Sequence, residues 1–324
     1  NRYPTHGGFS HGEVQPFWTS VPYGIALAHN GNLTNYNDLA KEVTKKETRY
    51  LNTTSDSEVL LHLFADELHQ EIPPQTDEEF FELLCESVTS IFKKVKGAYS
   101  VTSIIIGKGL VVFRDPQGIR PLVKGERKNS TGKIDYIFAS ENTMFYPLGY
   151  EPKGMVLPGE LIFIAESGKV YSKRLIKKEF NPCIFEYVYF ARPDATLNDV
   201  SVYRSRLRMG QNLAIAWKKK HPDIMPDIVI PAPSTANTAA LSFAHELGVR
   251  YSSYVGGYNQ YNQELLNTQS KYYQFSPDLT FLIIDIRNLI SEINEREYFI
   301  KKTPLQAGNM LNDFLFEIAT KVNN

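Results

Sequence analysis

Three polar clusters near the start of the chain carry the groups that acyl transfer on an amino acid substrate requires. They are Arg2-Tyr3-Pro4-Thr5, His29-Asn30-Gly31-Asn32 and Thr54-Ser55-Asp56-Ser57. Asn30 and Gly31 offer a side-chain amide and a backbone N–H, which together can hold a developing oxyanion. Arg2 suits a substrate carboxylate, and Asp56 suits a substrate ammonium group. The structural alternatives are a tight turn at Asn30-Gly31, a surface ion pair at Arg2 and a helix cap at Asp56.

Local patterns predict the elements that position these clusters. The apolar run at residues 23–28 predicts a strand, and Asn30-Gly31 predicts a tight turn after it, because both residues tolerate positive φ. Ser55, with Glu58 three residues later, predicts a capping box that opens an amphipathic helix. Apolar residues at helical spacing predict a second helix at about 77–94.

The pattern changes twice further along the chain. The stretches "AYSVTSIIIG", "LVVFRDPQGIRPLVKGE", "DYIFASEN" and "GELIFIAESGKVYSKRLI" predict strands, so the first part is expected to be an antiparallel sheet covered by helices. Next come a strand in "PCIFEYVYFARPDA", a basic helix at about 202–220, a strand–loop–helix in "PDIVIPAPSTANTAALSFAHELG" with Ser234 or Thr235 near the cap, and a strand in "DLTFLIIDIRN". This alternation predicts a parallel sheet. We expect two domains, 1–178 and 179–324.

Bulk composition excludes several classes of protein. The chain has 324 residues and a net charge of −1, which gives no reason to expect nucleic acid or an anionic membrane as a partner. No run approaches the length of a transmembrane helix. Two cysteines, Cys85 and Cys183, are too few for a disulfide framework or a zinc cluster and fit a reducing cytosol. Both are expected to be small buried apolar residues.

Six segments resemble amidophosphoribosyltransferases, the glutamine-dependent enzymes that open purine synthesis. They are "RYPTHGGFSHGEVQPF", "PYGIALAHNGNLTNYNDL", "NTTSDSEVLLHLFADEL", "GAYSV", "FRDPQGIRPLV" and "FEYVYFARPDATLNDVSVYRSRLRMG". They stand in order over roughly residues 1–250. Other amidotransferases with an N-terminal cysteine, such as glucosamine-6-phosphate synthase, share the Asn-Gly pair and an acidic glutamine ligand. "FEYVYFARPD" and the strand order of the second domain argue against them.

The resemblance implies an N-terminal-nucleophile αββα sandwich followed by an α/β type I phosphoribosyltransferase domain. It implies that Arg2, Thr5 and Asp56 bind glutamine, that Asn30 and Gly31 form the oxyanion hole, and that an N-terminal cysteine attacks the amide. Ammonia would then displace pyrophosphate from phosphoribosyl diphosphate and give 5-phosphoribosylamine. The resemblance further implies Mg²⁺, regulation by purine nucleotides, a homo-oligomer and a cytoplasmic location. Ser234, Thr235 and Asp285 would bind phosphoribosyl diphosphate, with Asp285 also near Mg²⁺.

The sequence departs from the family pattern at three places. The nucleophilic cysteine of the family precedes the "RYPT" motif, so we expect a chain that lacks the N-terminal segment and the glutaminase nucleophile. Of the acid pair in the second domain only Asp285 is kept, with Ile284 or Ile286 in the other position, and residues 287–291 contain no glycine for a phosphate cradle. In the flexible loop, Tyr258, Gln260 and Glu264 replace basic residues.

Two interpretations therefore stay open. One is a true amidophosphoribosyltransferase whose chain is incomplete, and the other is a non-catalytic paralogue that acts as a scaffold or regulator. In either case two cysteines cannot hold the four-cysteine iron–sulfur cluster of some family members.

Overall fold

The computed structural model describes residues 11–45, 49–232, 235–252 and 281–284, and it divides the chain into two compact units. The units are Asn1–Cys183 and Ile184–Asn324. The sequence had placed the boundary at residues 178 and 179. Of the predicted site residues, Arg2, Thr5, Ser234 and Asp285 lie outside the described residues, as does the loop with Tyr258, Gln260 and Glu264.

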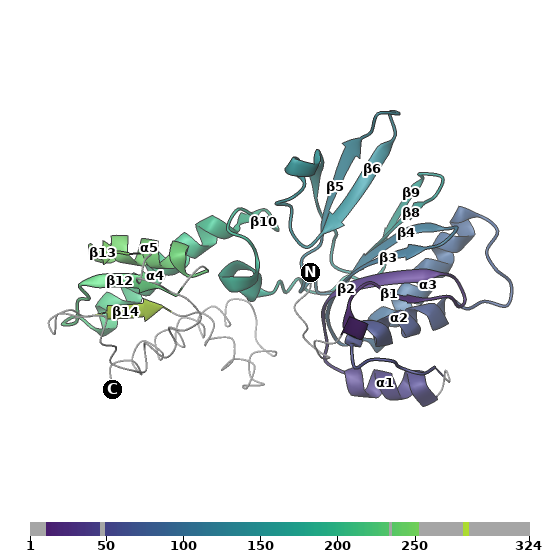
Figure 1. Cartoon of the computed structure of the whole chain (residues 1–324), viewed down its shortest axis with the longest axis horizontal. Helices are drawn as coiled ribbons and strands as arrows, with labels where there is room; N and C mark the ends of the chain where they lie inside the picture. Colours follow the sequence, from purple (N-terminus) through teal and green to yellow (C-terminus); the bar gives the residue numbers. More distant parts are fainter. Residues whose placement is uncertain (1–10, 46–48, 233–234, 253–280, 285–324) are drawn as a thin grey trace. The chain divides into compact units, whose positions relative to one another are not determined.

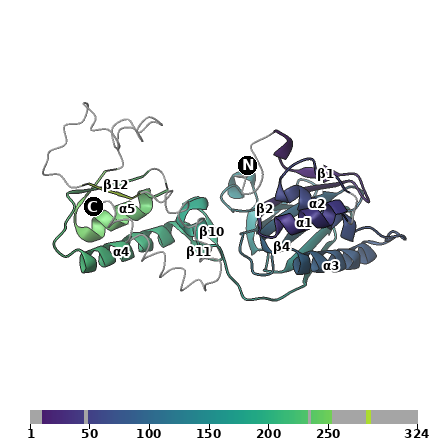
Figure 2. The same ribbon diagram turned by 90° about the horizontal axis from the view of Figure 1, so that it is seen from below.

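The first unit is built on a six-stranded antiparallel sheet in the order β1-β2-β3-β4-β8-β9. The strands are β1 (Phe17–Thr19), β2 (Ile25–Leu33), β3 (Gly97–Ile105), β4 (Gly109–Arg114), β8 (Glu160–Ala165) and β9 (Val170–Arg174). A short 3-10 turn, η1 (His11–Glu13), precedes β1. Helices α1 (Tyr36–Lys45), α2 (Asp56–Glu67) and α3 (Asp77–Lys94) cover one face of this sheet (Figures 1 and 2).

A second, three-stranded antiparallel sheet packs on the other face. Its order is β6-β5-β7, from β5 (Val123–Lys128), β6 (Ile134–Ala139) and β7 (Glu151–Met155), with the 3-10 turn η2 (Tyr146–Leu148) between β6 and β7. Alternate residues of β4 point to opposite faces of the six-stranded sheet and pack in two different hydrophobic cores. Val111 and Phe113 join the core under the helices, whereas Val112 joins the core between the sheets. The described part of this unit is therefore a helix layer followed by two sheets.

The predicted turn at Asn30-Gly31 is wrong, because β2 continues through both residues to Leu33 and the turn comes at Thr34 and Asn35. Every second residue of β2 is buried over its whole length, so the strand pairing overrides the local turn preference. Gly31 has a φ of 157°, and a Cβ there would overlap the carbonyl oxygen of Ala98 on β3. Glycine is thus required here by close approach of two backbones.

The predicted capping box of α2 is also wrong, although Ser55 is the N-cap and its hydroxyl accepts the N–H of Ser57. The Glu58 carboxylate reaches back instead to the backbone N–H groups of Asn52 and Thr53, each at 2.8 Å. Glu58 therefore fixes the loop before the helix. The reciprocal capping box belongs to α3, between Thr76 and Glu79.

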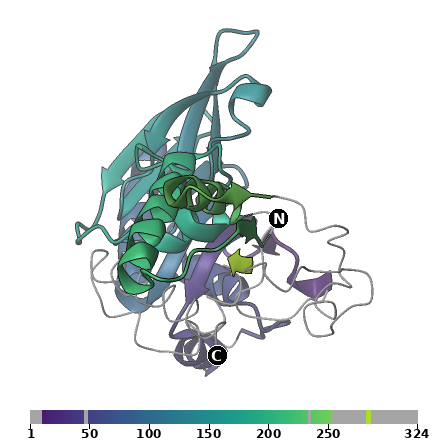
Figure 3. The same ribbon diagram turned by 90° about the vertical axis from the view of Figure 1, so that its left-hand side faces the viewer.

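The described part of the second unit places helices beside a parallel sheet in the order β13-β12-β14. Its strands are β12 (Ile228–Pro231), β13 (Arg250–Tyr251) and β14 (Phe281–Ile284), preceded by the short hairpin β10 (Thr196–Leu197) and β11 (Val200–Ser201). Helices α4 (Val202–Lys220) and α5 (Asn237–Leu247) lie side by side (Figures 2 and 3). Trp217 and Phe243 pack with Val229 in the core between them and the sheet.

The strand predicted in "FEYVYFARPD" is wrong, because Glu186–Phe190 forms a π-helix, η3. The aromatic and β-branched run favours a strand locally. The buried guanidinium of Arg206 on α4 overrides this preference by donating to the carbonyl oxygens of Tyr187, at 2.8 Å, and Ala191, at 2.7 Å. Such carbonyls at a helix end need partners from elsewhere.

No helix in the described ranges is both long enough and apolar enough to cross a membrane.

Candidate functional site

The backbone of β2 presents a polar edge opposite β3. Bonds from Ile106 N to Gly24 O and from Thr34 N to Lys96 O frame the β2–β3 ladder, so the even-numbered residues of β2 pair with β3. The N–H and C=O groups of His29, Gly31 and Leu33 consequently point to the other edge. Among the described strands, only β1 pairs with this edge, and it pairs only with residues Ile25–Leu27.

Two side chains flank the Gly31 amide along this edge. The Gln15 amide takes both backbone groups of His29, accepting its N–H at 2.6 Å and donating to its carbonyl oxygen at 3.1 Å. The Asp56 carboxylate accepts the N–H of Leu33 at 3.2 Å. The amide of Gly31 lies between these two contacts in sequence and on the same edge. Gly31 therefore lies on the same strand edge as the Leu33 N–H that binds Asp56, two residues away.

Asp56 is a fully buried carboxylate at the first position of α2. The positive end of the helix dipole favours a negative charge there. Its Oδ1 lies 3.8 Å from Nδ1 of buried His29, and the same ring nitrogen lies 3.2 Å from the hydroxyl of Ser57. Ser57 also accepts a bond from Gln15. Asp56 is therefore not the helix cap of the structural alternative, since Ser55 is the N-cap, and its carboxylate instead binds the backbone of β2 next to His29.

The side chain of Asn30 points to the opposite face of β2, toward the second sheet. Its Nδ2 donates to the Ser140 hydroxyl, directly after β6, at 2.7 Å. Its Oδ1 accepts a bond from Nη2 of Arg120 at 3.1 Å. The two predicted oxyanion donors thus come from one strand, with the backbone donor of Gly31 at the edge and the Asn30 amide on the face. Strand geometry positions them, in place of the turn that the sequence predicted.

The motif "FRDPQGIRPLV" forms a compact loop around a buried guanidinium. Arg114 donates to the carbonyl oxygens of Arg120, Val156 and Gly118 at 2.6, 2.9 and 2.7 Å. Asp115 is buried beside it and accepts N–H groups of Gln117 and Ile119. Burial raises the pKa of the Asp115 carboxyl, whereas these backbone bonds and Arg114 act in the opposite direction. The loop places the guanidinium of Arg120 within hydrogen-bonding distance of the Asn30 side chain.

The two cysteines have different surroundings. Cys85 is buried within α3, in the core under the helices, and burial raises the pKa of its thiol to about 11. A thiol with so little thiolate is a poor nucleophile. Cys183, the last residue of the first unit, is only half-buried, so the expectation of a buried cysteine is confirmed for Cys85 and wrong for Cys183. The N–H of Cys183 donates to the carbonyl oxygen of Ile119, next to Arg120, at 2.9 Å.

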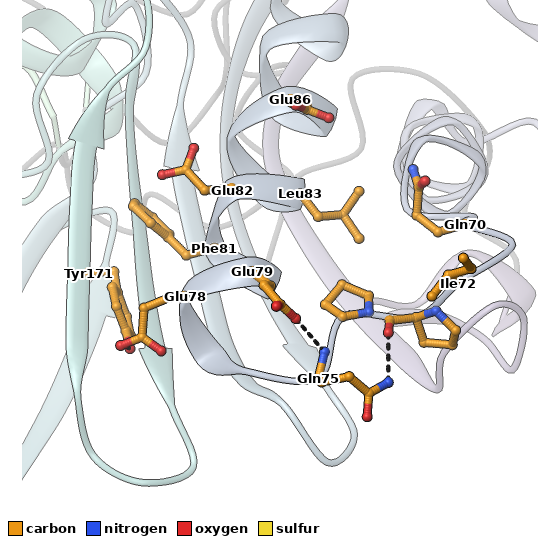
Figure 4. Close-up of a pocket in the computed structure, with 12 residues that line it drawn as sticks. Gln70, Ile72, Gln75, Glu78, Glu79, Phe81, Glu82, Leu83, Glu86 and Tyr171 are labelled. Carbon is orange, nitrogen blue, oxygen red and sulfur yellow. Dashed lines mark hydrogen bonds between the residues drawn. The ribbon is translucent and has the colours of Figure 1, made fainter.

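A groove of about 750 Å³ lies elsewhere on the first unit, between the α2–α3 loop, the start of α3 and Tyr171 on β9 (Figure 4). Its acidic residues are Glu78, Glu79, Glu82 and Glu86. Glu78 already binds Lys169 and Tyr171, and Glu79 caps its own helix. Since β9 is at the opposite edge of the sheet from β1 and β2, this groove is separate from the site at Gly31 and Asp56.

In the second unit, Thr235 lies in the loop between β12 and α5, just before Asn237 begins the helix. β14 pairs with β12 in parallel over its described residues, and Asp285 comes next in the sequence, outside the described ranges. Loops after neighbouring parallel strands open at the same edge of a sheet.

Sequence reasoning missed several residues that hold the site, namely Gln15, His29, Ser57, Arg120 and Ser140. His29 was within a quoted polar cluster, and Arg120 was within the quoted "FRDPQGIRPLV" motif. A buried polar residue inside a strand was the available signal for His29. Ser57 was within another quoted polar cluster and Gln15 within the quoted "RYPTHGGFSHGEVQPF" segment, whereas Ser140 carries no local signal, because only the fold brings it to β2.

Comparisons with known proteins agree on one family. Residues 8–147 match the family model described as "Glutamine amidotransferase domain". The chain is 46% identical over 253 residues to an amidophosphoribosyltransferase of Pseudomonas aeruginosa and 43% identical over 253 residues to that of Escherichia coli; each match covers 77% of this chain and 49% of the relative. The Schizosaccharomyces pombe enzyme is 42% identical over 265 residues, with the same coverage. The chain thus spans about half the length of the curated relatives it matches.

Solved structures give the same result. A glutamine phosphoribosylpyrophosphate amidotransferase from B. subtilis, complexed with ADP and GMP, matches with a TM-score of 0.60 at 28% identity, over 80% of this chain and 54% of its own. A structure titled as the allosteric regulatory enzyme of purine biosynthesis matches with a TM-score of 0.61 at 24% identity, over 87% of this chain and 60% of its own, and supports the fold alone. Over the 77% of its length that aligns, this chain is similar to amidophosphoribosyltransferases, and its residues 8–147 match a glutamine amidotransferase domain.

Proposed function

We propose that the chain is part of an amidophosphoribosyltransferase, and that its first unit takes ammonia from glutamine. The observation that carries this proposal is the edge of β2, where the backbone of Gly31 and the contact of the buried Asp56 carboxylate lie along one strand edge, with the Asn30 amide on the adjacent face. Asp56 would bind the α-ammonium group of glutamine, and Arg2 and Thr5 its α-carboxylate.

The proposed chemistry is acyl transfer. A nucleophile adds to the side-chain amide carbon of glutamine, and the carbonyl oxygen becomes an oxyanion. The Nδ2–H of Asn30 and the N–H of Gly31 donate to this oxyanion, which stabilises the transition state more than the ground state. Collapse of the intermediate expels ammonia, and water then releases glutamate from the acyl-enzyme. The resemblance assigns the nucleophile to an N-terminal cysteine, and the burial and thiol pKa of Cys85 argue against that residue as a substitute.

The second unit is proposed to have a type I phosphoribosyltransferase fold, with the domain boundary near residue 178. The parallel strands β12 and β14 and the strand–loop–helix from β12 to α5 support this fold. Ammonia would attack C1 of phosphoribosyl diphosphate, displace pyrophosphate and leave 5-phosphoribosylamine, the first product of purine synthesis. Ser234, Thr235 and Asp285 would hold the substrate at the edge where these loops open.

Mg²⁺, purine nucleotide regulators, a homo-oligomer and a cytoplasmic location are further parts of the proposal. The ADP and GMP named with the B. subtilis relative support nucleotide regulation. In the described ranges no group of three or more His, Cys, Asp or Glu residues could hold a metal ion. Asp285, which lies outside those ranges, would face a Mg²⁺ that is bound chiefly by the diphosphate of the substrate.

Calorimetry with glutamine tests the first half of the proposal without requiring turnover. Asp56→Asn is expected to abolish glutamine binding, because the substrate ammonium loses its charged partner. Asp66→Asn is the matched control on the same helix, since Asp66 pairs with Arg49 away from the edge of β2. Equal glutamine affinity in wild type and Asp56→Asn would contradict the assigned site.

Titration with phosphoribosyl diphosphate and Mg²⁺ tests the second half. Micromolar binding would support the phosphoribosyl site. Absence of binding at millimolar ligand would favour the second candidate function, a non-catalytic paralogue that acts as a scaffold or regulator. The isoleucine beside Asp285 and the replaced basic residues at Tyr258, Gln260 and Glu264 are the sequence observations that favour this candidate.

A further inference from the structure

The side-chain amide of Asn30 is held at both of its ends. Arg120 Nη2 donates to Oδ1 at 3.1 Å, and Nδ2 donates to the Ser140 hydroxyl at 2.7 Å. A guanidinium has only donors, so the atom that it contacts must be the amide oxygen. The orientation of the Asn30 amide is therefore fixed chemically, with its NH₂ group directed away from Arg120. Rotation of the amide by 180° would place an NH₂ group against the guanidinium.

The backbone of Arg120 is firmly placed. Its carbonyl oxygen accepts a bond from the fully buried Arg114 at 2.6 Å and another from the Ser100 hydroxyl at 3.2 Å. Ser100 is the β3 residue that pairs with Asn30 in the ladder. The backbone of Arg120 is thus tied to β4 through Arg114 and to β3 through Ser100, the residue opposite Asn30, so the loop presents the guanidinium from a fixed base.

Donation from a cation also changes the amide electronically. A hydrogen bond to the amide oxygen draws electron density from the nitrogen and makes its N–H groups stronger donors. Ser140 accepts a bond from the NH₂ group, which carries two hydrogens, so a second N–H can serve a substrate oxygen. An oxyanion donor gains from both effects, because it must be aimed correctly before charge develops.

We propose that Arg120 is a positioning residue of the oxyanion hole. It orients and polarises the Asn30 amide and does not touch the substrate. This role rests on the proposed glutaminase function of the first unit. The "FRDPQGIRPLV" loop would then contribute to the reaction indirectly. The buried Arg114 stabilises the loop through its carbonyl oxygens, and the loop places Arg120 against Asn30.

Steady-state kinetics of the protein that carries this chain test the role. Arg120→Gln is expected to lower kcat for glutamine about 10- to 100-fold, which is less than the loss on deleting an oxyanion donor outright. The KM for glutamine should change by less than about twofold, because Arg120 does not touch the substrate. Arg120→Lys, which keeps a cationic donor, should recover part of kcat. Synthesis from free ammonia should be unchanged, because it bypasses the glutamine site. Arg127→Gln is the matched control, since Arg127 is an exposed β5 residue paired with Asp135.

A kcat for glutamine that is unchanged in Arg120→Gln would overturn the role, and so would a rise in KM at constant kcat. Loss of the ammonia-dependent reaction as well would show a general folding defect and would equally contradict a role confined to positioning. Circular dichroism of each variant checks that the fold is retained.

A spectroscopic readout separates this inference from the proposed function. The Asn30 side-chain NH₂ gives a pair of ¹H–¹⁵N signals, which Asn30→Asp removes and so identifies. Arg120→Gln should shift this pair of signals and speed the exchange of the two protons with each other by rotation about the amide C–N bond. Arg127→Gln should leave the signals unchanged. Unchanged Asn30 signals would refute the inference even if glutamine is hydrolysed. Glutamine hydrolysis missing from the wild type, with the shift observed, would refute the proposed function and leave the Arg120–Asn30 coupling supported.

Discussion

Replacement of Arg114 by methionine should be among the most destabilising single changes in the first unit. The Arg114 side chain is 1% exposed, and its guanidinium donates to the carbonyl oxygens of Gly118, Arg120 and Val156. Methionine fills a similar volume but donates nothing. Each buried carbonyl left without a donor costs about 1–3 kcal/mol.

The three carbonyls do not contribute equally. The Ser100 hydroxyl also donates to the carbonyl of Arg120, so that group keeps a partner in Arg114→Met. The carbonyls of Gly118 and Val156 lose a charged donor each. Allowing for partial relaxation of the loop, the free energy of unfolding should fall by about 3–5 kcal/mol. That is a large part of the roughly 5–15 kcal/mol that stabilises a typical domain.

Urea denaturation measures this loss, and the two tryptophans help to localise it. Trp18 is on β1 of the first unit, whereas Trp217 is buried in the core of the second. In a Trp18→Phe background, fluorescence reports the second unit, and far-UV circular dichroism reports both. Arg127→Met is the control, because that exposed side chain should leave the free energy of unfolding nearly unchanged. A loss below about 1 kcal/mol in Arg114→Met would refute the reasoning.

Three further predictions follow from the described residues. Gly31→Ala should destabilise the first unit by about 2–3 kcal/mol in urea denaturation, because its Cβ overlaps the carbonyl of Ala98, whereas Gly107→Ala, with open space around it, should cost less. Cys85 should react with iodoacetamide at pH 8 at least about 100-fold more slowly in the native protein than in urea, as followed by mass spectrometry; a pKa of about 11 leaves roughly one thiol in a thousand ionised. Burial lowers the pKa of the His62 imidazole from 6.5, so the unfolded state binds a proton at this residue more readily than the folded state does. The free energy of unfolding is therefore unaffected by His62 above pH 6.5 and falls as the pH drops below that value. His62→Gln should reduce this fall when denaturation is measured as a function of pH.

Strongly periodic segments with a clear start were predicted well from the sequence. The second helix was expected at residues 77–94, and α3 is Asp77–Lys94, with Thr76 and Glu79 closing its first turn. The basic helix expected at 202–220 is α4. In both, the hydrophobic pattern and the capping chemistry agree with the tertiary packing, so local information is sufficient.

Predictions failed where a distant residue decides the local structure. Asn30-Gly31 favours a turn, but pairing with β3 holds both residues in a strand. The aromatic run at 186–190 favours a strand, but Arg206 binds its carbonyls and supports a helix. Glu58 has the spacing of a capping box, but the N–H groups of the preceding loop compete for it. None of these partners is visible in a local window of sequence.

The alternation of β2 explains why the candidate site needs residues from so many parts of the chain. Backbone groups of odd-numbered residues point to one edge, where Gln15 and Asp56 bind them, while the side chain of Asn30 points to the second sheet, where Arg120 and Ser140 bind it. Backbone N–H groups lie in the plane of a sheet and side chains stand roughly perpendicular to it, so a backbone donor and a side-chain donor on neighbouring residues point in different directions. A pair of oxyanion donors on neighbouring residues therefore requires support from two layers of the fold. The "FRDPQGIRPLV" loop supplies it on one side, and the start of α2 supplies it on the other.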